Sequence, residues 1–156
     1  MNQASDILTA MNAIKSMLEA ITVANGYNFT PALKRGWLQH IFQGRHREVV
    51  TFPVIAYRPD VSTPSGGDRT NNTNLKDLVT INLDCAVLVK DSEDVVADLL
   101  NLLKDVRRSL VFDPITEKLG VSEIQFLECP FDIPEAGEDY AFFSQKIRIQ
   151  VIEQYA

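Results

Sequence analysis

The sequence has few of the residues that build metal centres, disulfide frameworks or redox sites. It contains two cysteines, two histidines and one tryptophan in 156 residues. Neither Cys85 nor Cys129 has a second cysteine or a histidine at metal-ligand spacing, and both fall in strand-like segments. We therefore expect buried free thiols rather than a disulfide, and no metal or other cofactor.

Long apolar runs are also missing, since no stretch approaches the roughly 20 residues needed to cross a bilayer. The start, MNQASDILTAMNAIK, lacks the basic residues, apolar block and small-residue cleavage site of a secretory signal. We expect no membrane partner and a protein made in the cytoplasm of its cell. Hydrophobic residues make up 46% and charged residues 23% of the chain, as in ordinary globular domains. At this length one domain, residues 1–156, is the expectation.

No motif predicts catalysis. His40 and His46 lie six residues apart, which suits neither one helix face nor usual zinc spacing. The sequence Ser65-Gly66-Gly67-Asp68 lacks the lysine and the following helix of a phosphate-binding loop. We therefore predict that the protein is not an enzyme and has no catalytic residues.

Charge is spread unevenly over the chain, whose net charge is -6. Residues 1–78 carry eight basic and six acidic side chains, whereas residues 79–156 carry seven basic and fifteen acidic ones. A dedicated nucleic-acid binder usually has a concentrated basic face, so this distribution argues against that class. The asymmetry either serves solubility alone or provides unlike surfaces that meet when copies pack side by side.

Two helices are predicted from apolar stripes. In residues 5–22 the stripe is Ile7, Met11, Ile14, Leu18 and Ile21, with Ser5 or Asp6 as cap and Asn25-Gly26 as the end. The second stripe is Val95, Leu99, Leu102, Leu103, Val106 and Leu110, with Asp91 or Ser92 as cap and a stop at Asp113-Pro114.

Strands are predicted around residues 29–41, over 49–57, over 78–90, within 121–133 and over 140–152. The third alternates most cleanly, with Val79, Ile81, Leu83, Cys85, Val87 and Val89 on a core face and Thr80, Asn82, Asp84 and Lys90 on a wet face. Pro53 places the second strand at a sheet edge or makes the proline its start. The predicted fold is α+β, a mostly antiparallel sheet of four to five strands with two helices packed on one face.

Residues 59–74 form a long polar loop between two predicted strands, with Val61 as its only aliphatic residue. Such loops are uncommon in compact domains and are usually functional or disordered. We predict an assembly arm that contacts a neighbouring subunit or another protein, against the alternative of a merely flexible loop. The proposed interface residues are Arg45, His46, Arg47, Arg58, Asp68, Arg69, Asn71 and Asn72.

Three groups of segments together carry a resemblance. They are EAITVANGYNFT followed by LKRGW, then the proline-bearing VTFPVIAY, and finally LVTINLDCAVLVKD running through the second helix to LVFDP and KIRIQVIEQY. This succession is similar to the tail terminator proteins of tailed bacteriophages, the family of the minor tail protein U type. The likeness covers residues 5–155, and the 59–74 loop and GRHRE depart from it.

The resemblance implies a virion protein of the tail or neck that forms a ring, typically of six copies. The implied partners are the tail tube protein, the head–tail connector or other neck proteins, and the sheath protein as a further candidate. DNA would pass through such a ring without specific recognition. A ring needs a head-to-tail interface between unlike patches, which the basic and acidic halves would supply if they lie on opposite flanks. The alternatives are another neck component, such as a head-completion or collar protein, and a small ligand-binding α+β module.

Overall fold

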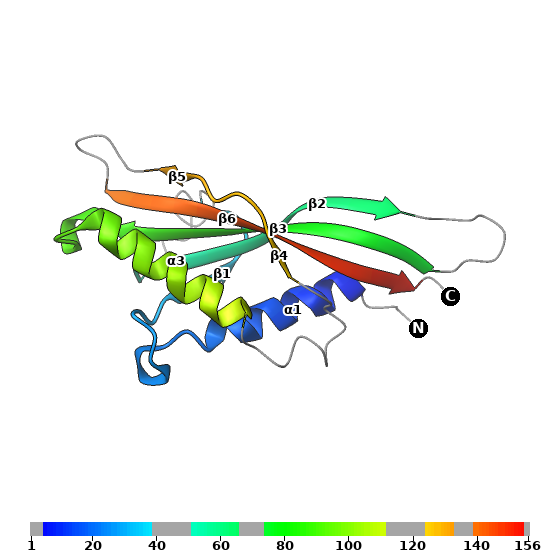
Figure 1. The fold of residues 1–156 in the computed structure, drawn as a ribbon, viewed down its shortest axis with the longest axis horizontal. Coiled ribbons are helices and arrows are strands. Elements are labelled where there is room, and N and C mark those ends of the chain that lie inside the picture. The colour runs from blue at the N-terminus through cyan, green and yellow to red at the C-terminus, as the bar shows by residue number, and fades with distance from the viewer. Residues whose placement is uncertain (1–4, 39–50, 66–73, 112–123, 133–138, 155–156) are drawn as a thin grey trace, which may run out of the picture.

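The computed structural model describes residues 5–38, 51–65, 74–111, 124–132 and 139–154. These residues form two α-helices, two short 3-10 turns and a six-stranded sheet (Figure 1). The elements are α1 (Asp6–Glu19), η1 (Val23–Asn25), β1 (Ala32–Arg35), β2 (Val54–Ser65), β3 (Asn74–Leu88), η2 (Val89–Asp91), α3 (Val95–Val111), β4 (Gln125–Phe126), β5 (Phe131–Asp132) and β6 (Tyr140–Gln154).

The sheet has the order β1-β2-β3-β6-β4, and β5 pairs with another part of β6. Only the β1–β2 pair is parallel, and every other pair is antiparallel. The predicted α+β class and mostly antiparallel sheet are confirmed, but the predicted four to five strands are six. The additional strand arises because residues 121–133 hold two short strands, β4 and β5, instead of one. Pro130 lies between them and has no N–H to donate to a continuous ladder.

Helix α1 begins where the sequence predicts. The Ser5 hydroxyl oxygen accepts a hydrogen bond from the Leu8 N–H at 3.3 Å, which satisfies one of the free donors of the first turn. The helix ends at Glu19, one turn earlier than predicted. Thr22 instead caps the separate turn η1, and Gly26, with φ 84°, ends that turn in the left-handed conformation.

Both helices pack on one face of the sheet, as predicted. The alternating residues of β3, from Val79 to Val87, are buried together with the α1 and α3 stripes in one core. The core-facing residues of β6 include Phe143, Ile147, Ile149 and Val151. Because side chains alternate along a strand, the intervening residues of β3 and β6 project from the opposite face.

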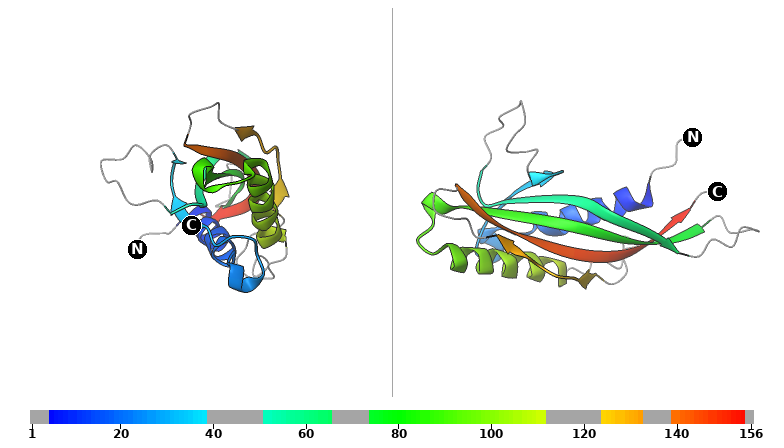
Figure 2. Two further views of the ribbon diagram at one scale, coloured as in Figure 1. Left: turned by 90° about the vertical axis from the view of Figure 1, so that its left-hand side faces the viewer. Right: turned by 90° about the horizontal axis from the view of Figure 1, so that it is seen from above.

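The predicted 59–74 loop is partly wrong. Residues from Pro59 to Ser65 continue β2 and pair with β3, with a bulge between Pro59 and Val61. Prolines fit here because β1 pairs only with the first four residues of β2, so the rest of β2 has no second partner strand among the described residues. Residues 66–73 lie outside the described part of the chain. Figure 2 shows β2, β3 and β6 running side by side along the molecule and extending past the end of α3.

The ends of three predicted strands also differ from the prediction. The one around residues 29–41 is reduced to β1, within the described residues, and β2 starts at Val54, directly after Pro53. The strand predicted over 78–90 is β3, and it ends at Leu88 because Val89 enters the turn η2. The second helix begins at Val95, where Asp94 rather than Asp91 or Ser92 accepts a hydrogen bond from the Ala97 N–H at 3.1 Å. The predicted stop at Asp113-Pro114 lies outside the described residues.

Candidate docking surface

The face of the sheet opposite the helices is the candidate functional surface. Pairing places Val61 beside Thr80, and Thr80 beside Arg148, across β2, β3 and β6. Thr63 and Leu78 are the next pair on the same face. Residues from three distant parts of the sequence therefore share one surface that no helix of the described chain covers.

One end of this face is covered by a small second core. Leu38, Val54, Ala56 and Ala86 are buried there, and Phe52 and Phe142 pack against them. The predicted wet face of β3 is therefore only partly wet. The burial of Val54 and Ala56 on this side explains why four successive residues of β2, from Val54 to Tyr57, are all buried.

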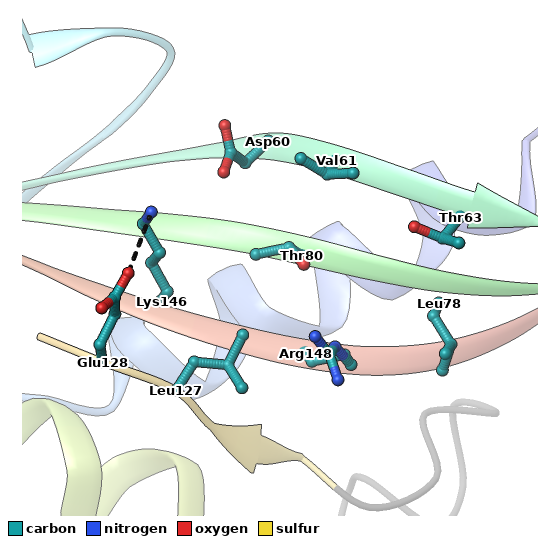
Figure 3. Close-up of a pocket in the computed structure, with 9 residues that line it drawn as sticks. All are labelled: Asp60, Val61, Thr63, Leu78, Thr80, Leu127, Glu128, Lys146 and Arg148. Atoms are coloured by element: carbon teal, nitrogen blue, oxygen red, sulfur yellow. Dashed lines mark ion pairs between the residues drawn. The ribbon is translucent and has the colours of Figure 1, made fainter.

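The other end of the face is open and holds a hollow of about 600 Å³ (Figure 3). Its lining consists of Asp60, Val61, Thr63, Leu78, Thr80, Leu127, Glu128, Lys146 and Arg148. Val61 is 51% exposed and Leu78 36%, and Ile152 further along the same face of β6 is 50% exposed. Neighbouring exposed aliphatic side chains with a polar rim are typical of surfaces that meet another molecule.

The charged side chains of the hollow differ in whether they form ion pairs. Lys146 Nζ lies 3.7 Å from a Glu128 carboxylate oxygen, and Arg58 lies 3.5 Å from Asp60. Arg148, in contrast, makes no ion pair or side-chain hydrogen bond with any residue that the structure describes. It projects beside Thr80 in the middle of the hollow (Figure 3). A cation without an ion pair among the described residues is the group best placed to attract an acidic partner.

A polar cluster borders the hollow. The Arg58 guanidinium lies 5.8 Å from the ring centroid of Trp37, which is 59% exposed, and its Nε lies 3.9 Å from Asp84. Ser144 donates a hydrogen bond to the Asp84 carboxylate. Tryptophan and arginine are the residues most enriched at the energetic centres of protein interfaces.

Two buried polar atoms of this cluster have no hydrogen-bond partner among the described residues. They are Nε of Arg58 and Oδ1 of Asn82, which occupy paired positions on β2 and β3. Asn82 is only 6% exposed. Buried polar groups are nearly always hydrogen-bonded to protein or water, so a donor and an acceptor left open side by side mark a place for water or a partner's polar group.

Of the predicted interface residues, only Arg58 is described by the structure. It lies within strand β2 and contacts Trp37 and two carboxylates, so it is not part of a projecting arm. The other predicted residues, Arg45, His46, Arg47, Asp68, Arg69, Asn71 and Asn72, lie outside the described residues.

Sequence reasoning missed Val61, Leu78 and Arg148. The exposed Leu78 directly precedes the alternating run of β3, and Arg148 stands between the inward Ile147 and Ile149. Alternation therefore places both on the outer face. Only the pairing register shows that they lie close to Val61.

The cysteines are not a reactive site. Both are free, with Cys85 buried and Cys129 partly buried, which confirms the expected free thiols. Burial raises the pKa of Cys85 well above its usual value, and the nearby Asp84 and Cys129 raise it further. Burial also raises the pKa of Cys129, although Arg107 opposes this shift. Both groups therefore favour the protonated, unreactive form.

The described residues hold no cluster of three or more histidine, cysteine or acidic side chains arranged to bind a metal ion. None of the described helices is both long enough and apolar enough to span a bilayer. Neither protein-family models nor curated protein sequences match this chain.

Proposed function

We propose that this protein is a structural component of a tailed bacteriophage that closes the tail tube. In this role copies form a ring, of six subunits by resemblance, on the end of the finished tube. The ring stops further addition of tube subunits and presents its other face to the head connector or neighbouring neck proteins. The work is done by matched surfaces and involves no bond-making.

The observation that carries the proposal is the half of the sheet face that none of the described helices covers. Val61, Leu78 and Ile152 are exposed on the same face as Arg148, which has no ion pair among the described residues, and Trp37 and Arg58 border them. Isolated exposed aliphatic residues are ordinary, but several on one face of a sheet beside such a cation fit a protein interface. The sequence resemblance names the assembly to which such an interface would belong.

The assembly arm of the sequence prediction becomes shorter in this proposal. Residues 59–65 are the end of strand β2, so only residues 66–73 remain as a segment that reaches a neighbouring subunit, the tube or the connector. DNA passes through the ring, and this proposal gives it no specific contacts. The proposed location is the virion tail or neck, after assembly in the host cytoplasm.

Electron microscopy of the purified protein tests the ring directly. We expect negative-stain images to show closed rings, with a matching mass by light scattering. Purified tail tubes should then carry a ring at one end and stop growing when tube protein is added. Rings that bind connectors but not tube ends would instead support a head-completion or collar protein. Monomers at every concentration would refute the ring.

The segment 66–73 is tested by replacing it with Asn-Gly, which leaves a four-residue connection between the paired Ser65 and Lys76. If the segment contacts a neighbour, the shortened protein keeps its melting temperature but forms fewer rings or fails to cap tubes. Normal rings and normal tubes from this variant would show that the segment has no part in assembly.

A small ligand-binding module is the second candidate function. The hollow of about 600 Å³ favours it, because this volume lies in the range of small-molecule sites, roughly 300–1,000 Å³. This candidate would be supported if the protein is monomeric and a metabolite raises its melting temperature. The same metabolite should then leave the melting temperature of an Arg148→Ala variant unchanged.

A further inference from the structure

The start of helix α3 carries a second exposed patch, which combines acidic and aliphatic side chains. Val96 is 48% and Leu100 51% exposed, and their four-residue spacing places them on one side of the helix. Asp91 and Glu93 are exposed just before this turn and form no ion pair within the described chain. Lys90 is the one basic residue beside them in sequence. We call Asp91, Glu93, Val96 and Leu100 the acidic patch.

The sign of charge reverses along α3. Its second half presents the exposed Lys104, Arg107 and Arg108 beside the exposed Val111. Only the first half of the helix therefore suits a basic partner surface. The hollow offers one such cation: its lining holds two acidic and two basic side chains, and Arg148 is the one without an ion pair among the described residues, since Asp60 and Glu128 lie within 4 Å of Arg58 and Lys146.

The acidic patch and the hollow lie on opposite sides of the molecule. Helix α3 packs on one face of the sheet, and the hollow opens on the other. The patch is also at the far end of α3 from its last residues, near the left end of the molecule in Figure 1. One copy therefore cannot join the two surfaces, whereas a head-to-tail row of copies joins them at every contact.

We propose that the start of α3 of one subunit docks in the sheet hollow of the next subunit in the ring. Arg148 then faces Asp91 and Glu93, while Val96 and Leu100 cover Val61 and Leu78. Two turns of helix are roughly 11 Å long and a helix is roughly 10–12 Å wide, which suits a hollow of this size. This inference rests on the proposed ring and names the surfaces that close it.

Charge reversal tests the docking. The first variant is Arg148→Glu, and the second is Asp91→Lys with Glu93→Lys, which leaves the helix cap Asp94 in place. Each is expected to weaken self-association by about tenfold or more, because like charges then meet across the interface. Arg35→Glu makes the same change of charge at an exposed residue outside both surfaces and should assemble normally. Unchanged melting temperatures of the monomers control for folding.

Rescue makes the test specific. A mixture of the two variants, or one chain carrying all three substitutions, is expected to form rings again, because each acidic surface then meets a basic one. Rings of wild-type size from Arg148→Glu alone would overturn the docking and leave the ring proposal intact. Loss of tube binding by intact Arg148→Glu rings would assign the hollow to the tube protein and likewise overturn it. A wild-type protein that never self-associates would overturn both.

Discussion

Replacing Asp105 should uncouple helix α3 from the turn that follows α1. Asp105 is only 2% exposed, and its carboxylate accepts hydrogen bonds from two successive backbone N–H groups. The donors are Asn28, at 2.9 Å and 3.1 Å to the two oxygens, and Phe29 at 3.0 Å. The Asn28 side-chain amide donates a further bond at 2.9 Å. One carboxylate thus holds the ANGYN segment to a helix more than seventy residues away in sequence.

The expected cost of Asp105→Ala follows from these contacts. A hydrogen bond to a charged group contributes about 1.5–3 kcal/mol, and the values for bonds that share one carboxylate do not add. Asn28 is exposed, so water replaces part of what its amides lose. We expect a loss of about 3 kcal/mol in the free energy of unfolding, which lowers the melting temperature by roughly 6–12 °C. Asp105→Asn should cost less than Asp105→Ala, because its amide oxygen still accepts hydrogen bonds. It should still cost some stability, because its NH₂ group cannot accept from the Asn28 donors.

Denaturant unfolding measures the global effect, and amide hydrogen exchange at Asn28 and Phe29 measures the local one. Asn101→Ala, at an exposed position of the same helix, should change stability by less than about 0.5 kcal/mol. A melting temperature of Asp105→Ala within about 1–2 °C of the wild type, with no faster exchange at those two amides, would refute this role. The carboxylate would then not hold the Asn28–Phe29 turn to helix α3.

The other predictions concern buried polar groups and thiols. Gln145→Leu should cost about 2 kcal/mol in denaturant unfolding, because fully buried Gln145 donates to the Leu127 carbonyl and accepts from Arg107 Nε. Native protein at pH 8 should react with a thiol reagent at Cys129 before Cys85, and the unfolded protein should react at both alike; fast labelling of native Cys85 would contradict its burial. Because the pKa of both thiols is higher in the folded protein than in the unfolded chain, their protonated form stabilises the fold. This contribution is fully present at pH values below the ordinary thiol pKa. That contribution should fall as pH rises above it, seen as a decreasing melting temperature.

Local patterns predicted most of the fold. The Ser5 cap, the two apolar stripes and the alternation of β3 each depend on neighbours within a few residues, and each was found as expected. The strand boundaries were less predictable. Residues 59–65 read as loop because they hold two prolines and one aliphatic residue, yet they pair with β3 along an edge that tolerates proline.

The candidate surface was less predictable than the fold, because it depends on register. Arg148 and Val61 are far apart in sequence, and a shift of one residue in either pairing would turn one of them toward the helices. No local pattern fixes that register. The open hydrogen-bonding atoms of Arg58 and Asn82 are equally invisible in sequence, since each residue type is normal in an exposed strand.

The charge asymmetry of the sequence takes a different form in the folded chain. The sequence prediction required the basic first half and the acidic second half to lie on opposite flanks, and the sheet order β1-β2-β3-β6-β4 places strands of the first half on one side of β3 and strands of the second half on the other. Strand β3 spans the boundary between the halves and pairs with both β2 and β6, so each face combines residues of both halves: Val61 of the basic half and Arg148 of the acidic half flank Thr80. In the proposed ring, the separation of charge that matters is between the two faces of the sheet. The helix layer carries Asp91 and Glu93 at one end, the sheet carries Arg148 on its uncovered side, and an interface between unlike patches requires charges divided in this way.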